Sequence, residues 1–497
     1  MQNRGRLLGS VKAASCLGAL ALGGLAGSAQ AETLREALVA VYNTNPTIEG
    51  ARASQRATDE DVQIQRAQGL PRVDATATHI EFLRRSTNSF TAPERNLGVN
   101  AQLQVPVYSG GAVRNGINAA QERVAAGQAD LRGTESAVFS QAVAAYMDVL
   151  RTEALAELSA NQVEVLRVTY ESTSDRFEIG DLTRTDVAQA QSRLALAEGD
   201  LRTAYANLVN ARETYVQLIG RAPMGLEAPP PLPGLPETVG TAVVTALENN
   251  PDLIAAKERA DAAGYDYEVA GAGRLPTIGF FANYDYSDFF GTLGGPVAST
   301  FSQSETTANA GVRVTIPLFQ GGLPAARQRQ AGARESAALE QVILTERSVI
   351  AQTRSAYSNW EASNAVIQSS QVAVAAAELS LEGVRAENSI GNRTIIDVLN
   401  AEQELLSARA QLVTARRNAY VAGFTLLAAM GKAEARDLNL DTGGPLYDPQ
   451  VNFDRVDGRI WDWDRDPEPS ANSTRTVDIE ASEALIGPVL EPEDPRQ

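Results

Sequence analysis

Side chains suited to covalent chemistry are scarce in this sequence of 497 residues. It contains one cysteine, Cys16, and one histidine, His79. A single cysteine excludes a disulfide framework and a thiolate zinc site, and a single histidine excludes a multi-histidine metal site. His79 lies on a predicted strand without the spacing of a catalytic triad, and there is no phosphate-binding loop. We therefore expect no enzyme activity, no cofactor and no metal centre, although carboxylates alone could still bind a cation.

The remaining candidates are polar and charged residues around two glycines, Gly180 and Gly391. Asp186 follows the first glycine and Asp397 the second, at the same distance along the chain. Each aspartate could attract cations or pair with an arginine. Each could equally be a helix N-cap or a first-turn acid that the helix dipole stabilises, and both roles can hold together. The elements that position these turns decide between the roles.

The chain is a duplication of a unit of about 200 residues. Asn45-Pro46 matches Asn250-Pro251, and a Leu-Pro pair follows each at the same distance. The segment VPVYSGG (105–111) matches IPLFQGG (316–322), and this second alignment holds as far as Gly431. Short repeats would indicate a solenoid, whereas a unit this large indicates two copies of one structural half. We divide the chain into repeat 1 (32–222), a proline-rich linker (223–237) and repeat 2 (238–431).

Long proline-free stretches predict helical hairpins in both repeats. No proline occurs from Val107 to Ala222 or from Ala325 to Gly444, and both stretches are rich in good helix formers. As continuous helices, residues 112–179 would span about 100 Å and residues 182–219 about 57 Å. Leucines recur every seven residues in the second of these segments, which is typical of coiled-coil packing.

Four segments alternate apolar and polar residues with the period of a strand. They are residues 72–83, 97–107, 277–290 and 308–318. One such segment would favour an ordinary soluble sheet. Four of them in a secreted, duplicated, helix-dominated chain favour membrane strands, with lipid on one face and water on the other. Four strands cannot close a barrel, and lipid does not tolerate open sheet edges, so several chains must share one barrel. The strand count does not choose among two, three or four chains.

The two ends of the chain differ from the repeats. Residues 1–31 combine basic residues, a short apolar stretch and Ala29-Gln30-Ala31, the pattern of a cleaved secretory signal. Cys16 is then removed, and no later apolar run is long enough for a transmembrane helix. A large share of the formal charge of −18 lies in the acidic segment Asp441–Gln497. We predict that residues 432–497 form a disordered or draped tail. This acidity argues against nucleic acid as a partner.

The duplication, the Asn-Pro and Leu-Pro marks, the strand ends and the two turns together resemble the TolC-like outer membrane efflux proteins, over about residues 32–431. The resemblance implies a mixed α and β membrane protein that is a homotrimer. Twelve strands would form an outer membrane β-barrel, and twelve helical strands a periplasmic α-helical barrel. The implied function is a passive channel-tunnel in efflux or type I secretion. Its implied partners are outer membrane lipid, a periplasmic adaptor (membrane fusion protein), and an inner membrane pump or ABC translocase.

The resemblance also implies roles for the turn residues, because the hairpin tips of the family form the periplasmic entrance. Asp397 matches an aspartate at the narrowest point, where three copies would attract cations and raise one another's pKa. Asn400 stands where some members place a second aspartate, so we expect one acidic ring. A latch between hairpins is implied for Thr185, Asp186, Arg393 and Asn388, the last standing where a tyrosine can join. Adaptor docking is implied for Gly180, Leu182, Thr183, Gly391, Asn392 and Thr394.

Two alternatives stay open at this stage. A secreted periplasmic coiled-coil scaffold or adaptor without a pore would explain the long helices, but it would not need four alternating strands. Within the channel class, the same residues would serve the export of drugs, metabolites or proteins. The sequence therefore does not choose the substrate or the inner membrane partner.

Overall fold

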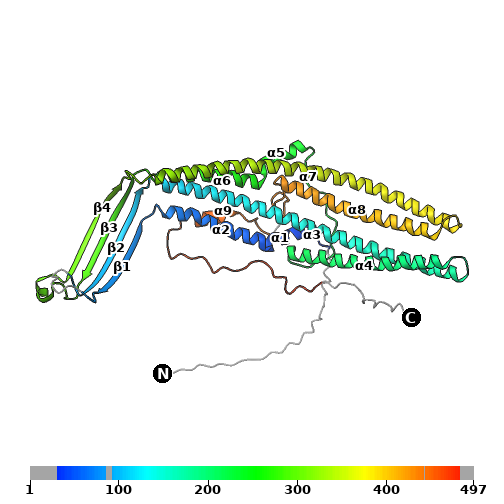
Figure 1. Cartoon of the computed structure of the whole chain (residues 1–497), viewed down its shortest axis with the longest axis horizontal. Helices are drawn as coiled ribbons and strands as arrows, with labels where there is room; N and C mark the ends of the chain where they lie inside the picture. The colour runs from blue at the N-terminus through cyan, green and yellow to red at the C-terminus, as the bar shows by residue number, and fades with distance from the viewer. Residues whose placement is uncertain (1–30, 85–91, 441–442, 482–497) are drawn as a thin grey trace, which may run out of the picture.

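The protein is described by a computed structural model that covers residues 31–84, 92–440 and 443–481. The molecule is elongated, with a β-sheet at one end and paired helices reaching to the other (Figure 1). The predicted signal segment falls outside the described residues except for Ala31. Within these three ranges, no helix has both the length and the apolar character needed to cross a membrane.

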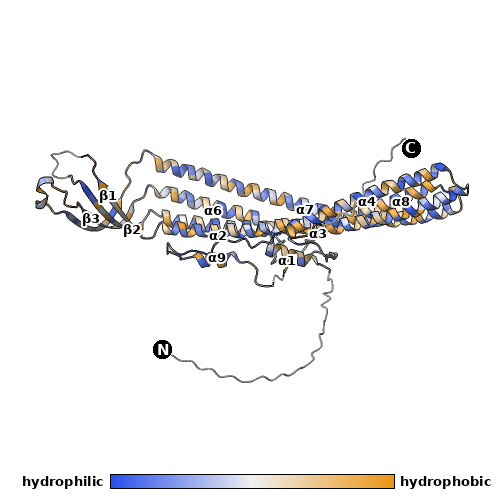
Figure 2. Ribbon diagram, turned by 90° about the horizontal axis from the view of Figure 1, so that it is seen from below, coloured by the Kyte–Doolittle hydropathy of each residue, from blue (hydrophilic) through white to orange (hydrophobic). Residues whose placement is uncertain are grey.

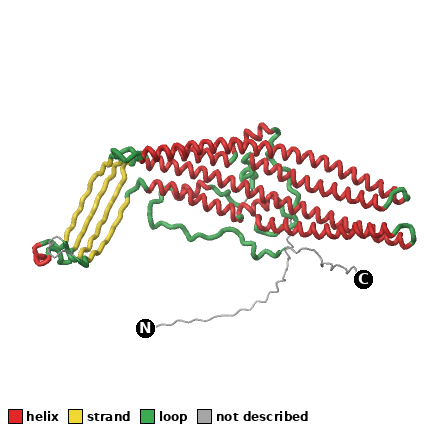
Figure 3. The backbone as a smooth tube through the Cα atoms, viewed as in Figure 1, coloured by secondary structure: helices red, strands yellow, loops and turns green. Residues whose placement is uncertain are grey.

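Both repeats contain the same succession of two shorter helices, two strands and a long helical hairpin (Figure 3). Repeat 1 consists of α1 (Leu34–Thr44), α2 (Pro46–Ala67), β1 (Arg72–Glu81), β2 (Arg95–Tyr108), α3 (Ala112–Glu178) and α4 (Arg184–Ile219). Repeat 2 consists of α5 (Val239–Asn249), α6 (Pro251–Ala272), β3 (Thr277–Asp288), the 3-10 helix η1 (Gly295–Thr300), β4 (Ser304–Thr315), α7 (Leu323–Ser389) and α8 (Ile395–Ala429). A last helix, α9 (Pro449–Val456), follows repeat 2.

The four strands form one antiparallel sheet in the order β1-β2-β3-β4. The central pairing joins the two repeats, with Ala101 of β2 opposite Tyr284 of β3. Among the described residues, the outer strands β1 and β4 each have one neighbouring strand, so each presents an unpaired edge. In lipid such an edge has no hydrogen-bond partner, which is why the sheet must continue into other copies of the chain.

The repeated sequence marks have direct structural roles. Gly110 and Gly111 adopt positive φ angles of 66° and 88° where β2 turns into α3, and the matching Gly-Gly pair turns β4 into α7. The Asn45 side chain accepts from the Thr47 backbone and donates to the carbonyl of Leu218, which caps α2 and ties it to the end of α4. Asn250 does the same for α6 and α8. Each Asn-Pro mark therefore fastens the start of a repeat to its end.

The hairpins carry the turn residues far from the sheet. Helices α3 and α7 each have 67 residues, which corresponds to about 100 Å of helix. Figure 2 shows hydrophobic and hydrophilic residues mixed along all of the long helices. This mixture suits helices that pack sideways against neighbours and meet water on their other faces. The observed helix lengths agree with those predicted from the proline-free stretches. The mixed α and β fold class also agrees with the prediction.

The main hydrophobic core lies at mid-length and combines buried residues of α1, α3, α4 and α8. The fully buried Phe139, Tyr146 and Tyr215 are central to it. The tail, for which the sequence predicts a disordered or draped segment, contributes Leu440 to this core and forms α9 against α2. The described part of the tail is thus fixed to the body of the protein.

Candidate functional site

Both turn glycines lie at the hairpin tips, the end of the molecule opposite the sheet (Figure 1). Gly180 separates α3 from α4, and Gly391 separates α7 from α8. Their φ angles are 83° and 79°, in the left-handed region that favours glycine. The local reason for both turns is therefore the same, and it brings the surrounding polar residues to one end of the molecule.

At the first tip, Thr183 and Asp186 form a capping box at the start of α4. The Asp186 Oδ2 atom accepts from the Thr183 backbone nitrogen at 2.9 Å and from its hydroxyl at 2.7 Å. In return, the Asp186 backbone nitrogen donates to the Thr183 hydroxyl at 3.3 Å. Leu182 is half-buried, whereas Gly180 and Thr185 are exposed.

The second tip repeats this arrangement at the start of α8. The Asp397 Oδ2 atom accepts from the Thr394 backbone nitrogen at 3.0 Å and from its hydroxyl at 2.7 Å. The Asn392 backbone nitrogen closes the turn on the carbonyl of Glu387 at 2.9 Å. Both aspartates therefore occupy the first-turn capping position that the sequence allowed, and this leaves their second oxygen atoms, Oδ1, outside the cap.

The caps set the charge state of the two aspartates within one chain. Hydrogen bonds from Thr183 lower the pKa of Asp186, and those from Thr394 lower the pKa of Asp397. Both carboxylates are therefore ionised at neutral pH. Any rise in pKa from three clustered copies of Asp397 would act against this lowering.

The arginine at the second tip pairs within its own turn. Arg393 donates from Nε to Glu387 at 2.7 Å, and the Asn388 side chain donates to the Arg393 carbonyl at 2.8 Å. Hydrogen bonding to Glu387 raises the pKa of Arg393. Within the described part of one chain, the structure brings Arg393 and Asn388 together, but it does not bring either to Thr185 or Asp186.

The two hairpins of one chain meet just behind the tips. Val163, Leu166, Ala197 and Leu399 form a small buried cluster between them. Beside it, Arg193 of α4 donates from Nη2 to the Oδ1 atom of Asn400 on α8 at 3.0 Å. A cavity of about 280 Å³ adjoins this contact and is lined by residues of both hairpins. Asn400 thus acts as the acceptor of a hydrogen bond between the hairpins.

Several tip residues were missed by the analysis of the sequence. Arg176 pairs with Asp181 across the first turn at 2.6 Å, which mirrors the pair of Arg393 with Glu387. Ile179 and Ile390 precede the two turn glycines and are 80% and 71% exposed. The signal for these isoleucines was present, because they occupy matching positions in the two repeats. No local pattern pointed to the Arg193 contact, because its partner lies 207 positions away.

The comparisons with known proteins agree with this geometry. The model of the family described as outer membrane efflux protein matches residues 37–221 and 242–432. The outer membrane efflux protein BepC of Brucella suis is 32% identical, over 86% of this chain and 91% of its own length. The outer membrane protein TolC of Escherichia coli is 27% identical, over 84% of this chain and 86% of its own length. The solved structure of VceC from Vibrio cholerae superposes with a TM-score of 0.68 at 22% identity, covering 80% of this chain and 96% of that one.

A four-stranded antiparallel sheet with open edges, continued by paired long helices, defines a channel protein whose wall is shared among copies of the chain. The chain belongs to the outer membrane efflux protein family. It is a non-enzymatic outer membrane channel with a periplasmic helical part, and it serves a tripartite efflux or type I secretion system. Membership of this family implies a trimeric channel that works with an efflux pump.

Proposed function

We propose that the hairpin tips form a regulated periplasmic entrance, held closed by contacts between hairpins. The observation that carries this proposal is the hydrogen bond from Arg193 to Asn400. It joins α4 to α8 less than one helical turn from Asp397, at the end of the tunnel opposite the membrane strands. Because opening must separate neighbouring hairpins at this level, a bond between them favours the closed entrance.

Asp397 forms the cation-binding constriction in this proposal. Its Oδ2 atom is engaged by the cap, so the second oxygen of each carboxylate is the one offered to a cation. Three copies around the trimer axis would concentrate negative charge at one level. Asn400 adds no charge to this level and instead contributes to the closing contact.

The latch residues act between protomers rather than within one. Within the single chain, the planar guanidinium of Arg393 donates to Glu387. Thr185 and Asp186 of a neighbouring protomer could accept hydrogen bonds from the other guanidinium nitrogens. Asn388 supports it by donating to the Arg393 carbonyl. An exposed arginine that exchanges one carboxylate partner for another forms a weak latch, because exposed ion pairs contribute little free energy to stability.

The tips are also the docking surface for a periplasmic adaptor. Both turns present backbone and small side chains at Gly180, Thr183, Gly391, Asn392 and Thr394, with Leu182 beside them. Each tip also carries an isoleucine, Ile179 or Ile390, whose side chain is exposed to water. Exposed apolar side chains of this kind favour contact with a partner protein. The inner membrane member would be a pump or an ABC translocase, and a homotrimer would offer six such tips.

The proposed division of the chain keeps repeat 1 at 32–222, the linker at 223–237, repeat 2 at 238–431, a signal at 1–31 and a tail at 432–497. The two ranges matched by the family model support the repeat boundaries. The repeated use of Asn45 and Asn250 to fasten each repeat supports them independently.

Docking is tested by complementing a deletion strain and assaying both drug susceptibility and secreted proteins. Ile179→Asp combined with Ile390→Asp should abolish complementation while trimers and their conductance in planar bilayers persist. Val244→Asp is the matched control, because Val244 is 56% exposed on α5, far from the tips. Full complementation by the double variant would refute docking at the tips. Whichever assay responds to the deletion identifies the class of substrate.

A further inference from the structure

The loop that follows α9 carries a patch of large apolar side chains on the surface. Ile460, Trp461 and Trp463 are 71%, 73% and 74% exposed. Tryptophan is usually well buried, so two of them exposed within three positions, beside an isoleucine, suggest a surface that meets a partner. The third tryptophan of the chain, Trp360, is half-buried against Tyr357 and Leu426.

Ion pairs hold this loop in one shape. Arg459 donates to Asp464 at 2.7 Å and to Asp466 at 2.8 Å, and Arg455 pairs with Asp466 at 2.9 Å. The hydrogen bonds from Arg455 and Arg459 lower the pKa of Asp466 to about 2, so the ion pairs persist at neutral pH. The loop is thus closed on itself, with the two tryptophans displayed between the paired residues.

Helix α9 fixes the loop to α2 through polar contacts. The side chain of Asn452 donates to the fully buried Asp59 at 2.6 Å. At the end of α9, Asp457 accepts from Gln63 at 3.1 Å and from Arg66 at 2.5 Å. A buried carboxylate with two donors is costly to disrupt, so the position of the loop is set by the body of the protein.

These contacts place the loop where the helices meet the strands. Arg66 lies in the last turn of α2, and β1 begins at Arg72, which is within about 17 Å of the end of α2 even for an extended chain. Trp461 follows Asp457 by four residues. Figure 1 shows the chain after α9 turning back beside this end of α2. The strands cross the outer membrane, so the loop lies at the level of its periplasmic surface.

The loop also lies on the outer side of the helical wall. Helices α1 and α9 lie on the same side of the long helices (Figure 2). There they form an added layer with the linker and the tail, which share one hydrophobic core with α1. A conduit needs an open lumen, so a layer of this thickness belongs outside the tunnel rather than within it.

We infer that Ile460, Trp461 and Trp463 dock on the phospholipid surface of the periplasmic leaflet of the outer membrane, next to the barrel. Tryptophan is enriched at membrane interfaces, because its ring is apolar and its indole nitrogen donates a hydrogen bond to polar groups. The pairing of Asp464 and Asp466 with arginines removes two negative charges that would oppose approach to phosphates. Three such loops in a trimer would brace the helical tunnel against the membrane.

Fluorescence quenching by lipid tests this inference on the full mature trimer. Trp360→Phe leaves Trp461 and Trp463 as the only reporters. In vesicles of phosphatidylethanolamine and phosphatidylglycerol, lipids brominated near the head of the acyl chain should remove roughly half of the emission, as expected for an interfacial ring. Lipids brominated near the chain end should quench less, and acrylamide should quench less in vesicles than in detergent.

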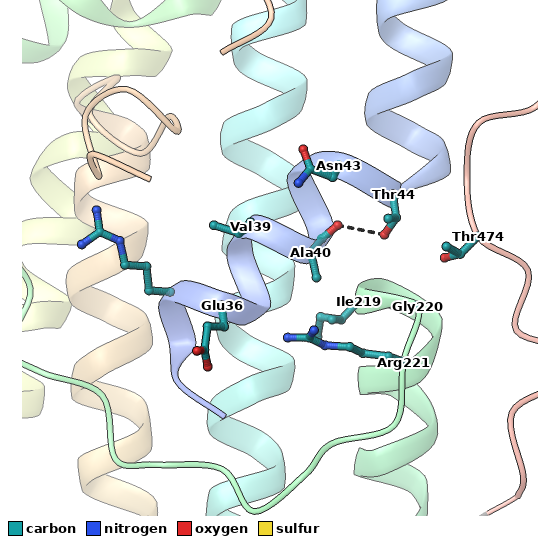
Figure 4. A pocket seen from close by; sticks show the side chains of 10 residues that line it. Glu36, Val39, Ala40, Asn43, Thr44, Ile219, Gly220, Arg221 and Thr474 are labelled. Atoms are coloured by element: carbon teal, nitrogen blue, oxygen red, sulfur yellow. Dashed lines mark hydrogen bonds between the residues drawn. The ribbon is translucent and has the colours of Figure 1, made fainter. Parts of the chain in front are cut away.

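A second reporter in the same tail is the matched control. Figure 4 shows Thr474 beside Gly220 at the end of α4. Figure 1 shows that α4 lies away from the strands. Val477→Trp, in a chain whose three native tryptophans are phenylalanine, should therefore not be quenched by brominated lipid. Equal quenching of both reporters, or none of the native pair, would overturn the inference. So would a native pair that stays unquenched while Trp461→Ala with Trp463→Ala weakens the trimer, because the patch would then contact a second copy.

Discussion

The hydrogen bond from Arg193 to Asn400 gives a quantitative expectation for the entrance. It is 3.0 Å long, it joins α4 to α8, and Asn400 is exposed to water. An exposed bond of this kind contributes about 0.5 kcal/mol, at the low end for hydrogen bonds in proteins. If the entrance opens by separating the hairpins in all three protomers together, removing three bonds destabilises the closed state relative to the open state by about 1.5 kcal/mol. That corresponds to roughly a tenfold higher ratio of open to closed channels.

The assay is single-channel recording in planar bilayers with the purified trimer. Arg193→Ala and Asn400→Ala should each raise the ratio of open to closed channels by about tenfold, and the double variant should raise it no further. Arg202→Ala, another charge deletion on α4, is the control and should leave the open fraction unchanged. An unchanged open fraction in both single variants would refute the closing role of the bond. Additive effects would show that the two side chains act separately.

The other predictions concern the charged tips and the tail. Asp397→Ala should relieve block by multivalent cations several-fold in the same recordings, since it removes the carboxylate ring; persistent block would place the ring elsewhere. Arg393→Ser should raise single-channel conductance, and an unaltered value would argue against a latch at that position. Asn452→Ala removes a donor from the buried Asp59, so the tail should become more sensitive to proteases by an amount equivalent to about 1–3 kcal/mol; an unaltered cleavage rate would contradict this. The lowered pKa values of Asp186 and Asp397 mean that cap stability is full above about pH 4 and is lost as the pH falls through the folded-state values. The protection factors of the tip amides, which correct hydrogen exchange for its intrinsic pH dependence, should therefore fall on acidification. Thr183→Val with Thr394→Val should weaken that dependence, because valine removes the hydroxyl donors and keeps the backbone donors.

The sequence determined those features that repeat or that depend on neighbouring residues. Proline-free stretches located the long hairpins, and the observed α3 (Ala112–Glu178) ends one residue before the predicted limit. Alternation located the four strands, because side chains on a strand change face at every residue. The strand count also required several copies, since unpaired edges cannot face lipid. The family resemblance supplied the trimer and the channel.

The same local rules explain what was foreseen at the tips. Thr183 with Asp186, and Thr394 with Asp397, are capping boxes within a single turn, so short spacing was enough to suggest first-turn acids. The sequence did not show that Arg393 would form an ion pair with Glu387 of its own chain. That choice depends on how the turn folds, because several carboxylates lie within reach of a long, flexible arginine.

Tertiary structure alone decided which distant residues meet. Arg193 and Asn400 are 207 positions apart, and Asp59 and Asn452 are 393 apart. No periodicity relates such pairs, because their contact arises from the packing of whole helices and not from neighbouring residues. For the same reason, composition did not show that the described part of the tail is anchored by the contact of Asn452 with the buried Asp59 and by Leu440 in the main core. The packing of α9 on α2 sets the position of the two exposed tryptophans near the start of the membrane strands, and the sequence alone does not show this contact.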